Sequence, residues 1–277
     1  MKLKKFMEVI KGKHKNNMQI ILKDHKSSFI VFTFFRILTV IILARQIILG
    51  NFESAFFCIL TILLLYLPCW VQKSLPIVLP PALEITIFCF IFAAEILGEV
   101  SCFYVLVPGW DTMLHTINGF LCAAVGFALI TLLNKSERIV FELSPFFIAL
   151  VSFCFSMTIG VLWEFFEFGA DCLLHTDSQK DTVIHAIHSV SLDATRTNSV
   201  VSISDIESVT VNGAELGLGG YLDIGLIDTM KDLFVNFIGA VVFCLIGYCC
   251  IKGKRFWKPF VAAIIPRRRE NRKNGSE

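Results

Sequence analysis

The stretch DTMLHTINGFLCAAVGFALITLL, residues 111–133, decides the fold of this chain because it is long, continuous and almost entirely apolar. A helix needs about 20 residues to cross the hydrocarbon core of a bilayer, and this run has that length. Its acidic and basic side chains are confined to the start, where Asp111 and His115 stand four positions apart. We therefore expect a transmembrane helix that carries a polar face at one end only.

Five further apolar segments have a similar length: 28–49, 53–72, 82–106, 145–169 and 226–251. Of the 277 residues, 55% are hydrophobic and only 17% are charged, and the mean hydropathy is +0.71. A soluble domain of ordinary composition carries more charge than this. The sequence therefore predicts an all-α integral membrane bundle of about six transmembrane helices.

Lysine and arginine are concentrated at both ends of the chain. Positively charged segments beside membrane spans stay in the cytoplasm, so we expect both termini to be cytoplasmic. The long connection before the last span then lies on the outer side. The basic ends lack the interleaved aromatic residues of a nucleic-acid groove, and we expect them to contact membrane lipids instead.

These boundaries divide the chain into five parts: a basic cytoplasmic amphipathic segment (1–27), transmembrane helices one to five (28–169), an extracytoplasmic loop (170–225), the sixth transmembrane helix (226–251) and a basic cytoplasmic tail (252–277). Within the loop, residues 197–216 alternate β-branched and polar side chains and include Asn212-Gly213. This dipeptide is typical of tight hairpin turns. We expect a small β-hairpin there.

Polar side chains recur at helical spacing near the outer ends of the last three predicted spans. They are Asp111 and His115 in the fourth span, Glu164 and Glu167 in the fifth, and Asp228, Asp232 and Asn236 in the sixth. Residues three or four positions apart share one face of a helix. We therefore expect these side chains to meet at one depth of the membrane, with Glu95 and Glu99 of the third span at a similar level.

Carboxylates that are crowded into a low-dielectric region cannot all stay ionised without compensating positive charge. Arg45 and Lys231 are the candidate partners, and they are too few. Several bound protons or a divalent cation would supply the missing charge, and carboxylates with one imidazole suit Mg²⁺, Mn²⁺ or Zn²⁺. The predicted metal ligands are Asp111, His115, Glu164, Glu167, Asp228, Asp232 and Asn236, and the predicted catalytic groups among them are Asp111, His115, Glu164 and Glu167.

A simpler role is expected for acids at or beyond the ends of the spans. Glu99, Asp171 and Asp223 lie where charge is tolerated near lipid head groups. We expect these three to form local pairs or to cap helices.

The order of motifs along the C-terminal half matches a known pattern. The matching residues are Trp110-Asp111, His115 and Gly119, then Trp163-Glu164 and Glu167, then Gly220, Asp223, Asp228, Asp232, Asn236 and Gly239-Ala240. This order resembles the YjdF-like family of bacterial inner-membrane proteins and, more loosely, the VanZ-like proteins connected with glycopeptide resistance. The resemblance implies a location in the bacterial cytoplasmic (inner or plasma) membrane and, on the VanZ-like side, a function in the cell envelope.

Three classes of function fit this sequence. The first is a metal-dependent membrane hydrolase or transferase that acts on a lipid head group or a lipid-linked envelope intermediate, and the position of the polar residues at the head-group level favours it. Against it, the sequence lacks a Ser-His-Asp nucleophile arrangement, so the chemistry would depend on the metal. The second is a transporter of cations or protons, and the third is a non-catalytic membrane scaffold. A transport path needs polar groups through the full membrane, whereas the inner halves of the last three spans are apolar.

Overall fold

The computed structural model describes residues 26–74, 77–134, 143–253, 256 and 258–268. The predicted amphipathic segment 1–27 lies outside this range except for its last two residues, which begin the first helix. The fold is mostly helical, as predicted. The helices are α2 (Lys26–Ile48), α3 (Phe52–Leu64), α4 (Leu67–Ser74), α5 (Pro81–Ile91), η1 (Phe92–Val100), α6 (Phe103–Leu106), α7 (Trp110–Asn134), α8 (Pro145–Leu174), α9 (Leu226–Ile251) and α10 (Lys258–Ile264).

Within the described residues, five helical segments are long and apolar enough to cross a membrane: Lys26–Ile48, Phe52–Ser74, Trp110–Thr131, Pro145–Leu174 and Leu226–Ile251. They correspond to five of the predicted spans. Two local signals explain where the fourth of these helical segments, α8, begins. Pro145 occupies its first turn, where a missing N–H is harmless, and the Ser144 side chain accepts a hydrogen bond from the Phe147 amide at 3.2 Å.

The remaining predicted span, 82–106, is divided in the structure. α5 continues directly into η1, a π-helix, which ends at Val100. Cys102 then adopts a left-handed backbone conformation with φ of 58° before the short α6. The expected continuous helix is therefore wrong in its last part, because a residue in this conformation cannot continue a right-handed helix.

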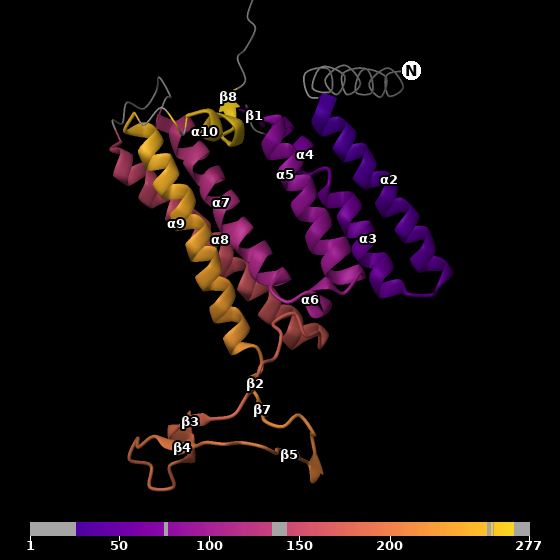
Figure 1. Cartoon of the computed structure of the whole chain (residues 1–277), viewed down its shortest axis with the longest axis vertical. Coiled ribbons are helices and arrows are strands. Elements are labelled where there is room, and N and C mark those ends of the chain that lie inside the picture. Colours follow the sequence, from indigo (N-terminus) through magenta and orange to yellow (C-terminus); the bar gives the residue numbers. More distant parts are fainter. Residues whose placement is uncertain (1–25, 75–76, 135–142, 254–255, 257, 269–277) are drawn as a thin grey trace, which may run out of the picture.

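The long helices run antiparallel to their chain neighbours, so the chain alternates between two ends of the molecule (Figure 1). The start of α2 lies at the same end as strand β8 (Arg267–Arg268), which pairs with β1 (Ile77–Val78). The connection between α8 and α9 lies at the opposite end, close to α6 and the start of α7. We call this second end the loop end of the molecule.

The helices form two groups, each with its own apolar interior. Between α7, α8 and α9, a buried cluster includes Phe127 and Phe243. Between α2, α3 and η1, a second cluster includes Phe92 and Ile96. Many large apolar side chains also point outward, as at Phe165, which is 67% exposed. Helices that are apolar on both their packed and their exposed faces are typical of a bundle that is surrounded by lipid.

α7 and α9 pack at backbone distance through two glycines. A Cβ atom on Gly119 would collide with the carbonyl oxygen of Asn236, and a Cβ atom on Gly239 would collide with the carbonyl oxygen of Thr116. The Ser156 hydroxyl of α8 donates to the Gly119 carbonyl at 2.7 Å and ties the third helix to this contact. Small residues of this kind let membrane helices approach each other at backbone distance.

The connection between α8 and α9 contains three short antiparallel strand pairs. They are β2 (Val183–Ile184) with β7 (Tyr221–Leu222), β3 (Ile187–Ser189) with β4 (Val201–Ile203), and β5 (Thr210–Val211) with β6 (Ala214–Glu215). The predicted hairpin is confirmed at β5 and β6, whose turn residues Asn212 and Gly213 have φ values of 52° and 84°. Residues 201–203, before this hairpin, pair with β3 instead.

Substitution of Gly239 by Ala tests the α7–α9 contact. The added methyl group has to displace the backbone of α7 at Thr116, so we expect a loss of about 1–3 kcal/mol in the free energy of unfolding. Denaturant unfolding in mixed micelles measures this loss. Gly169→Ala is the matched control, because nothing lies within 4 Å of the position of its added carbon. A Gly239→Ala protein as stable as the wild type would contradict this description of the contact.

Candidate metal centre

Three helices bring polar side chains together at the loop end of the molecule. α7 begins at Trp110, so its first turns carry Asp111 and His115. α9 begins at Leu226, after Gly225 with φ of 83°, and its second turn carries Asp232. Glu164 comes from the part of α8 that approaches the same end. The predicted convergence of these side chains is therefore present for residues from the fourth, fifth and sixth predicted spans.

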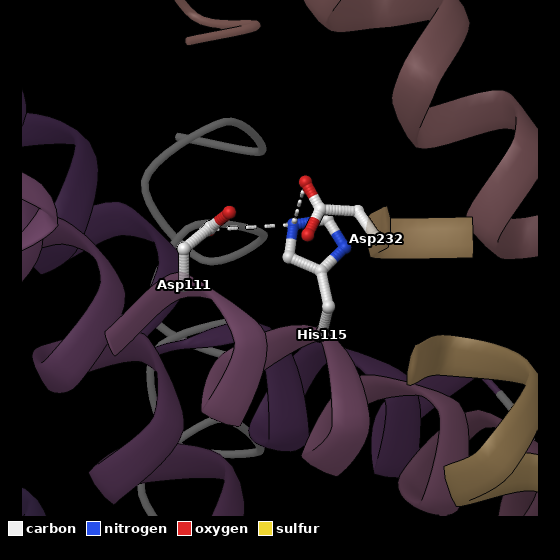
Figure 2. Close-up of side chains that lie close together, drawn as sticks. All are labelled: Asp111, His115 and Asp232. Atoms are coloured by element: carbon white, nitrogen blue, oxygen red, sulfur yellow. Dashed lines mark ion pairs between the residues drawn. The ribbon is translucent and has the colours of Figure 1, made fainter. Parts of the chain in front are cut away.

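His115 is the centre of this group. Its Nε2 atom lies 3.5 Å from Asp111 Oδ1 and 3.8 Å from Asp232 Oδ2, and Figure 2 shows both interactions meeting at the same ring nitrogen. The exposed fraction of His115 is 9%, and that of Asp232 is 3%. One ligand atom from each of Asp111, His115 and Asp232 can be chosen so that all lie within 4.8 Å of one another. These residues form a compact, mostly buried set of metal-ligating groups.

The two distances from His115 Nε2 are longer than direct hydrogen bonds and close to the spacing of ligands around one metal ion. A hydrogen bond between an imidazole nitrogen and a carboxylate is about 2.7–3.2 Å long, which is shorter than either Nε2 distance. Ligand atoms that each lie about 2.1 Å from one tetrahedral metal ion are separated by about 3.4 Å. The Nε2 distances to Asp111 and Asp232 are close to this spacing.

Glu164 approaches the imidazole from its other nitrogen. Glu164 Oε1 lies 4.0 Å from His115 Nδ1, and Glu164 is only 5% exposed. Metal-binding histidines commonly direct their second ring nitrogen towards a carboxylate, which fixes the tautomer and the orientation of the ring. Glu164 therefore lies on the side of the ring from which an orienting carboxylate approaches, and its role as a direct ligand stays a prediction.

The other predicted ligands have different partners. Glu167 accepts a hydrogen bond from Trp163 Nε1 at 2.8 Å. Asp228 accepts one from the Lys180 amide at 2.8 Å. Asn236 lies deeper on α9, where its Oδ1 accepts from Asn118 Nδ2 at 3.4 Å. Direct metal binding by Glu167, Asp228 and Asn236 stays a prediction, because the described group suited to a metal contains Asp111, His115 and Asp232.

Among the described residues, neither of the two cations considered as charge partners forms an ion pair with this group. Arg45 and Lys231 both have exposed side chains. Within the described ranges, the ion pairs of Asp111, Glu164 and Asp232 all involve His115. One imidazole cannot neutralise these carboxylates together, so the electrostatic argument for an additional positive charge persists in the folded protein.

Asp171 and Asp223 organise the start and the end of the outer connection. Asp171 accepts hydrogen bonds from the amides of Ser178 and Gln179 at 2.6 and 2.9 Å. Asp223 accepts them from the amides of Thr182 and Ile227, both at 2.7 Å. The capping expectation is confirmed for Asp223, which accepts from the Ile227 amide in the first turn of α9, whereas Asp171 binds amides of the connection beyond the end of α8.

Sequence reasoning missed Gln179, which approaches the site from the outer connection. Its Nε2 atom donates to Thr229 Oγ1 at 2.5 Å and to Glu164 Oε2 at 3.5 Å. The segment around Gln179 has no helical periodicity, so the spacing of its residues does not indicate that Gln179 approaches the site. The glycine at position 225 reflects this approach indirectly. In the structure, a Cβ atom on Gly225 would lie 2.7 Å from the Cβ atom of Gln179.

Comparison with known proteins places the chain in one family. Residues 30–253 match the family described as Predicted membrane protein (DUF2238), and the chain belongs to that family. The match extends across both groups of helices and the outer connection. No curated protein and no solved structure matches the chain. The YjdF-like name and the VanZ-like relation remain predictions.

The pH dependence of the outer connection tests the role of Asp223. Burial by itself would raise the pKa of Asp223, but hydrogen bonds from the amides of Thr182, Ile227 and Gly225 outweigh it and hold the pKa below the ordinary value of 3.8. A carboxyl group with a lowered folded-state pKa stabilises the fold above its unfolded-state pKa, and this stabilisation is lost as the pH falls through the folded-state value. We expect Asp223→Asn to accelerate hydrogen exchange in peptides containing Thr182 and Ile227 at pH 7.

The difference between wild type and Asp223→Asn should shrink as the pH falls below 3.8, because the wild-type carboxylate then becomes protonated as well. Asp181→Asn is the control, since Asp181 is an exposed acid of the same connection. Equal exchange in wild type and Asp223→Asn at pH 7 would contradict the capping role.

Proposed function

We propose that this protein is a six-helix cell-membrane protein with an outward-facing divalent-metal site, and that it acts on a lipid head group or a lipid-linked envelope intermediate. The observation that carries the proposal is the set formed by Asp111, His115 and Asp232, whose ligand atoms come within 4.8 Å of one another at the meeting point of α7 and α9. Buried ionisable groups at membrane depth are costly and usually serve a function.

The topology proposed here has six crossings, with α5 and η1 together forming the third. Support comes from the antiparallel course of the helices and from the start of α2 and strand β8 lying at one end of the molecule (Figure 1). The basic segments flank that end in the sequence, so the positive-inside rule assigns it to the cytoplasm. The metal site then belongs to the outer leaflet of the bacterial cytoplasmic membrane.

In the proposed site, Asp111, His115 and Asp232 bind the metal, and Glu164 orients His115. A divalent metal ion in such a site polarises a phosphoryl or carbonyl oxygen or activates a water molecule. Glu167, one helical turn beyond Glu164, is the proposed general base, and its hydrogen bond from Trp163 fixes its position. Nitrogen and oxygen ligands suit Zn²⁺ or Mn²⁺, and Mg²⁺ is the alternative if water completes the site.

A lipid head group is the proposed substrate because of where the site lies along the helices. Trp163 and Phe166, on the same part of α8 as Glu164, are 46% and 65% exposed and have their ring centroids 5.5 Å apart. Exposed tryptophan near the end of a membrane helix is typical of the interface between hydrocarbon and head groups. A site at this depth can receive a head group without extracting the lipid from the bilayer.

Transport of cations or protons has less support. On the cytoplasmic side of Asn236, the space between α7, α8 and α9 is filled by apolar side chains, among them Ala123, Phe127, Ala240 and Phe243. These four side chains are at most 3% exposed, and the buried Ser152 hydroxyl beside them donates to the Ile148 carbonyl, so the buried side chains of this cluster carry no charge for an ion. A non-catalytic scaffold is the other alternative, and it predicts the same fold without a metal.

Metal content tests the proposal. The protein is purified in mild detergent, incubated with Zn²⁺ or Mn²⁺, freed of excess metal and measured by mass spectrometry. We expect about one tightly held ion per chain in the wild type, and its loss in His115→Ala and Asp232→Asn, because each variant removes a ligand. Asp177→Asn is the control, since Asp177 is an exposed acid of the outer connection that pairs with Lys180.

Wild-type protein that elutes as a single folded species and retains neither metal after incubation would overturn the proposed function. Retention of the ion in both His115→Ala and Asp232→Asn would show that metal binds elsewhere and would also overturn it. Loss of metal in these variants but not in Asp177→Asn would justify a screen of lipid and lipid-linked substrates.

A further inference from the structure

The first part of the outer connection, residues 176–182, is fixed across the ends of α8 and α9, and we call it the outer strap. Asp171, in the last turns of α8, accepts hydrogen bonds from the Ser178 and Gln179 amides. Asp228, in the first turn of α9, accepts one from the Lys180 amide. Three consecutive backbone N–H groups of the strap are therefore held by carboxylates of both helices.

Gln179 is the strap residue whose side chain reaches the candidate metal centre. The side chain is half-buried, and its Nε2 atom donates to Thr229 Oγ1 at 2.5 Å and to Glu164 Oε2 at 3.5 Å. The turn before α9 is shaped around it. A Cβ atom on Gly225 would lie 2.7 Å from Gln179 Cβ and 2.9 Å from the Gln179 carbonyl oxygen, so only glycine fits there.

These contacts form a continuous series that leads from the strap to the metal-ligating atoms. Gln179 contacts Oε2 of Glu164, and the other oxygen of that carboxylate faces His115 Nδ1 at 4.0 Å. The opposite nitrogen of the same ring, Nε2, faces Asp111 and Asp232. An amide that restricts the rotation of the Glu164 carboxylate therefore also restricts the orientation of the imidazole.

We propose that Gln179 is a positioning residue of the metal centre: it holds Glu164 against His115 and thereby couples the metal affinity of the site to the conformation of the outer strap. This inference rests on the proposed metal-binding function. Groups that orient a metal-binding histidine typically change metal affinity by about 10–100-fold when they are removed. The coupling is reciprocal, so a bound metal stabilises the strap by the same factor.

The test uses the full-length chain in detergent with Co²⁺ as the probe, because Co²⁺ accepts the same ligands as Zn²⁺ and its visible absorption reports the coordination geometry. Gln179→Met keeps the length of the side chain and removes its donor, and Gln179→Ala removes both. We expect each variant to bind Co²⁺ about 10–100-fold more weakly than the wild type and to show an altered visible spectrum. Asp177→Asn, also in the strap, should match the wild type in affinity and spectrum.

A double-mutant cycle separates positioning through Glu164 from a general loosening of the strap. In a Glu164→Gln background, the additional effect of Gln179→Met on Co²⁺ affinity should fall below about twofold, because both substitutions interrupt the same series of contacts. A full effect of Gln179→Met in that background would overturn the proposal, since Gln179 would then act independently of Glu164.

The remaining outcomes distinguish this inference from the function on which it rests. If the wild type binds Co²⁺ and both Gln179 variants keep its affinity and its spectrum, the positioning role is overturned and the metal site stands. If the wild type binds no Co²⁺, Zn²⁺ or Mn²⁺, both the metal site and the role of Gln179 are overturned. Weaker binding with an altered spectrum in Gln179→Met, together with the expected cycle, supports both.

Discussion

The contact between the backbones of α7 and α9 is the constraint on which the rest of the structure depends. Gly119 and Gly239 bring the two helices so close that either added Cβ atom would strike a carbonyl oxygen of the opposite helix. The same faces carry His115 and Asp232 towards the loop end. The close packing therefore fixes the distance between the proposed metal ligands, and a metal site needs such rigid support.

Several features of this arrangement could be predicted because they depend on local spacing or on length. Apolar runs of membrane-spanning length predict the helices, and the four-residue spacing of Asp111 and His115 predicts a shared helical face. The Asn212-Gly213 turn is predictable because both residues tolerate positive φ. The meeting of acids from different helices follows from their common depth in the membrane, since antiparallel helices of similar length bring their ends to the same level.

Other features depend on contacts between distant segments, which local spacing does not encode. The common depth of the acids does not determine how each helix is rotated about its own axis. This rotation places His115 near Asp232, whereas Glu167 accepts a hydrogen bond from Trp163. The π-helical end of the third predicted span has no marker in an apolar sequence. Gln179 lies in a connection, and its approach to Glu164 depends on carboxylates at the ends of two helices. Long-range contacts of this kind also explain why 201–203 pairs with β3 rather than with its nearer neighbours.

The central claim is that a metal binds between one imidazole and the carboxylates of α7 and α9. X-ray absorption spectroscopy of the Zn²⁺-loaded protein tests it most directly, because it identifies the atoms around the metal. The account predicts nitrogen and oxygen ligands at about 2.0–2.2 Å, with the scattering of a single imidazole. The chain contains 10 cysteines and 6 histidines. Sulfur ligands at about 2.3 Å, or scattering from several imidazoles, would contradict the account and locate the metal elsewhere.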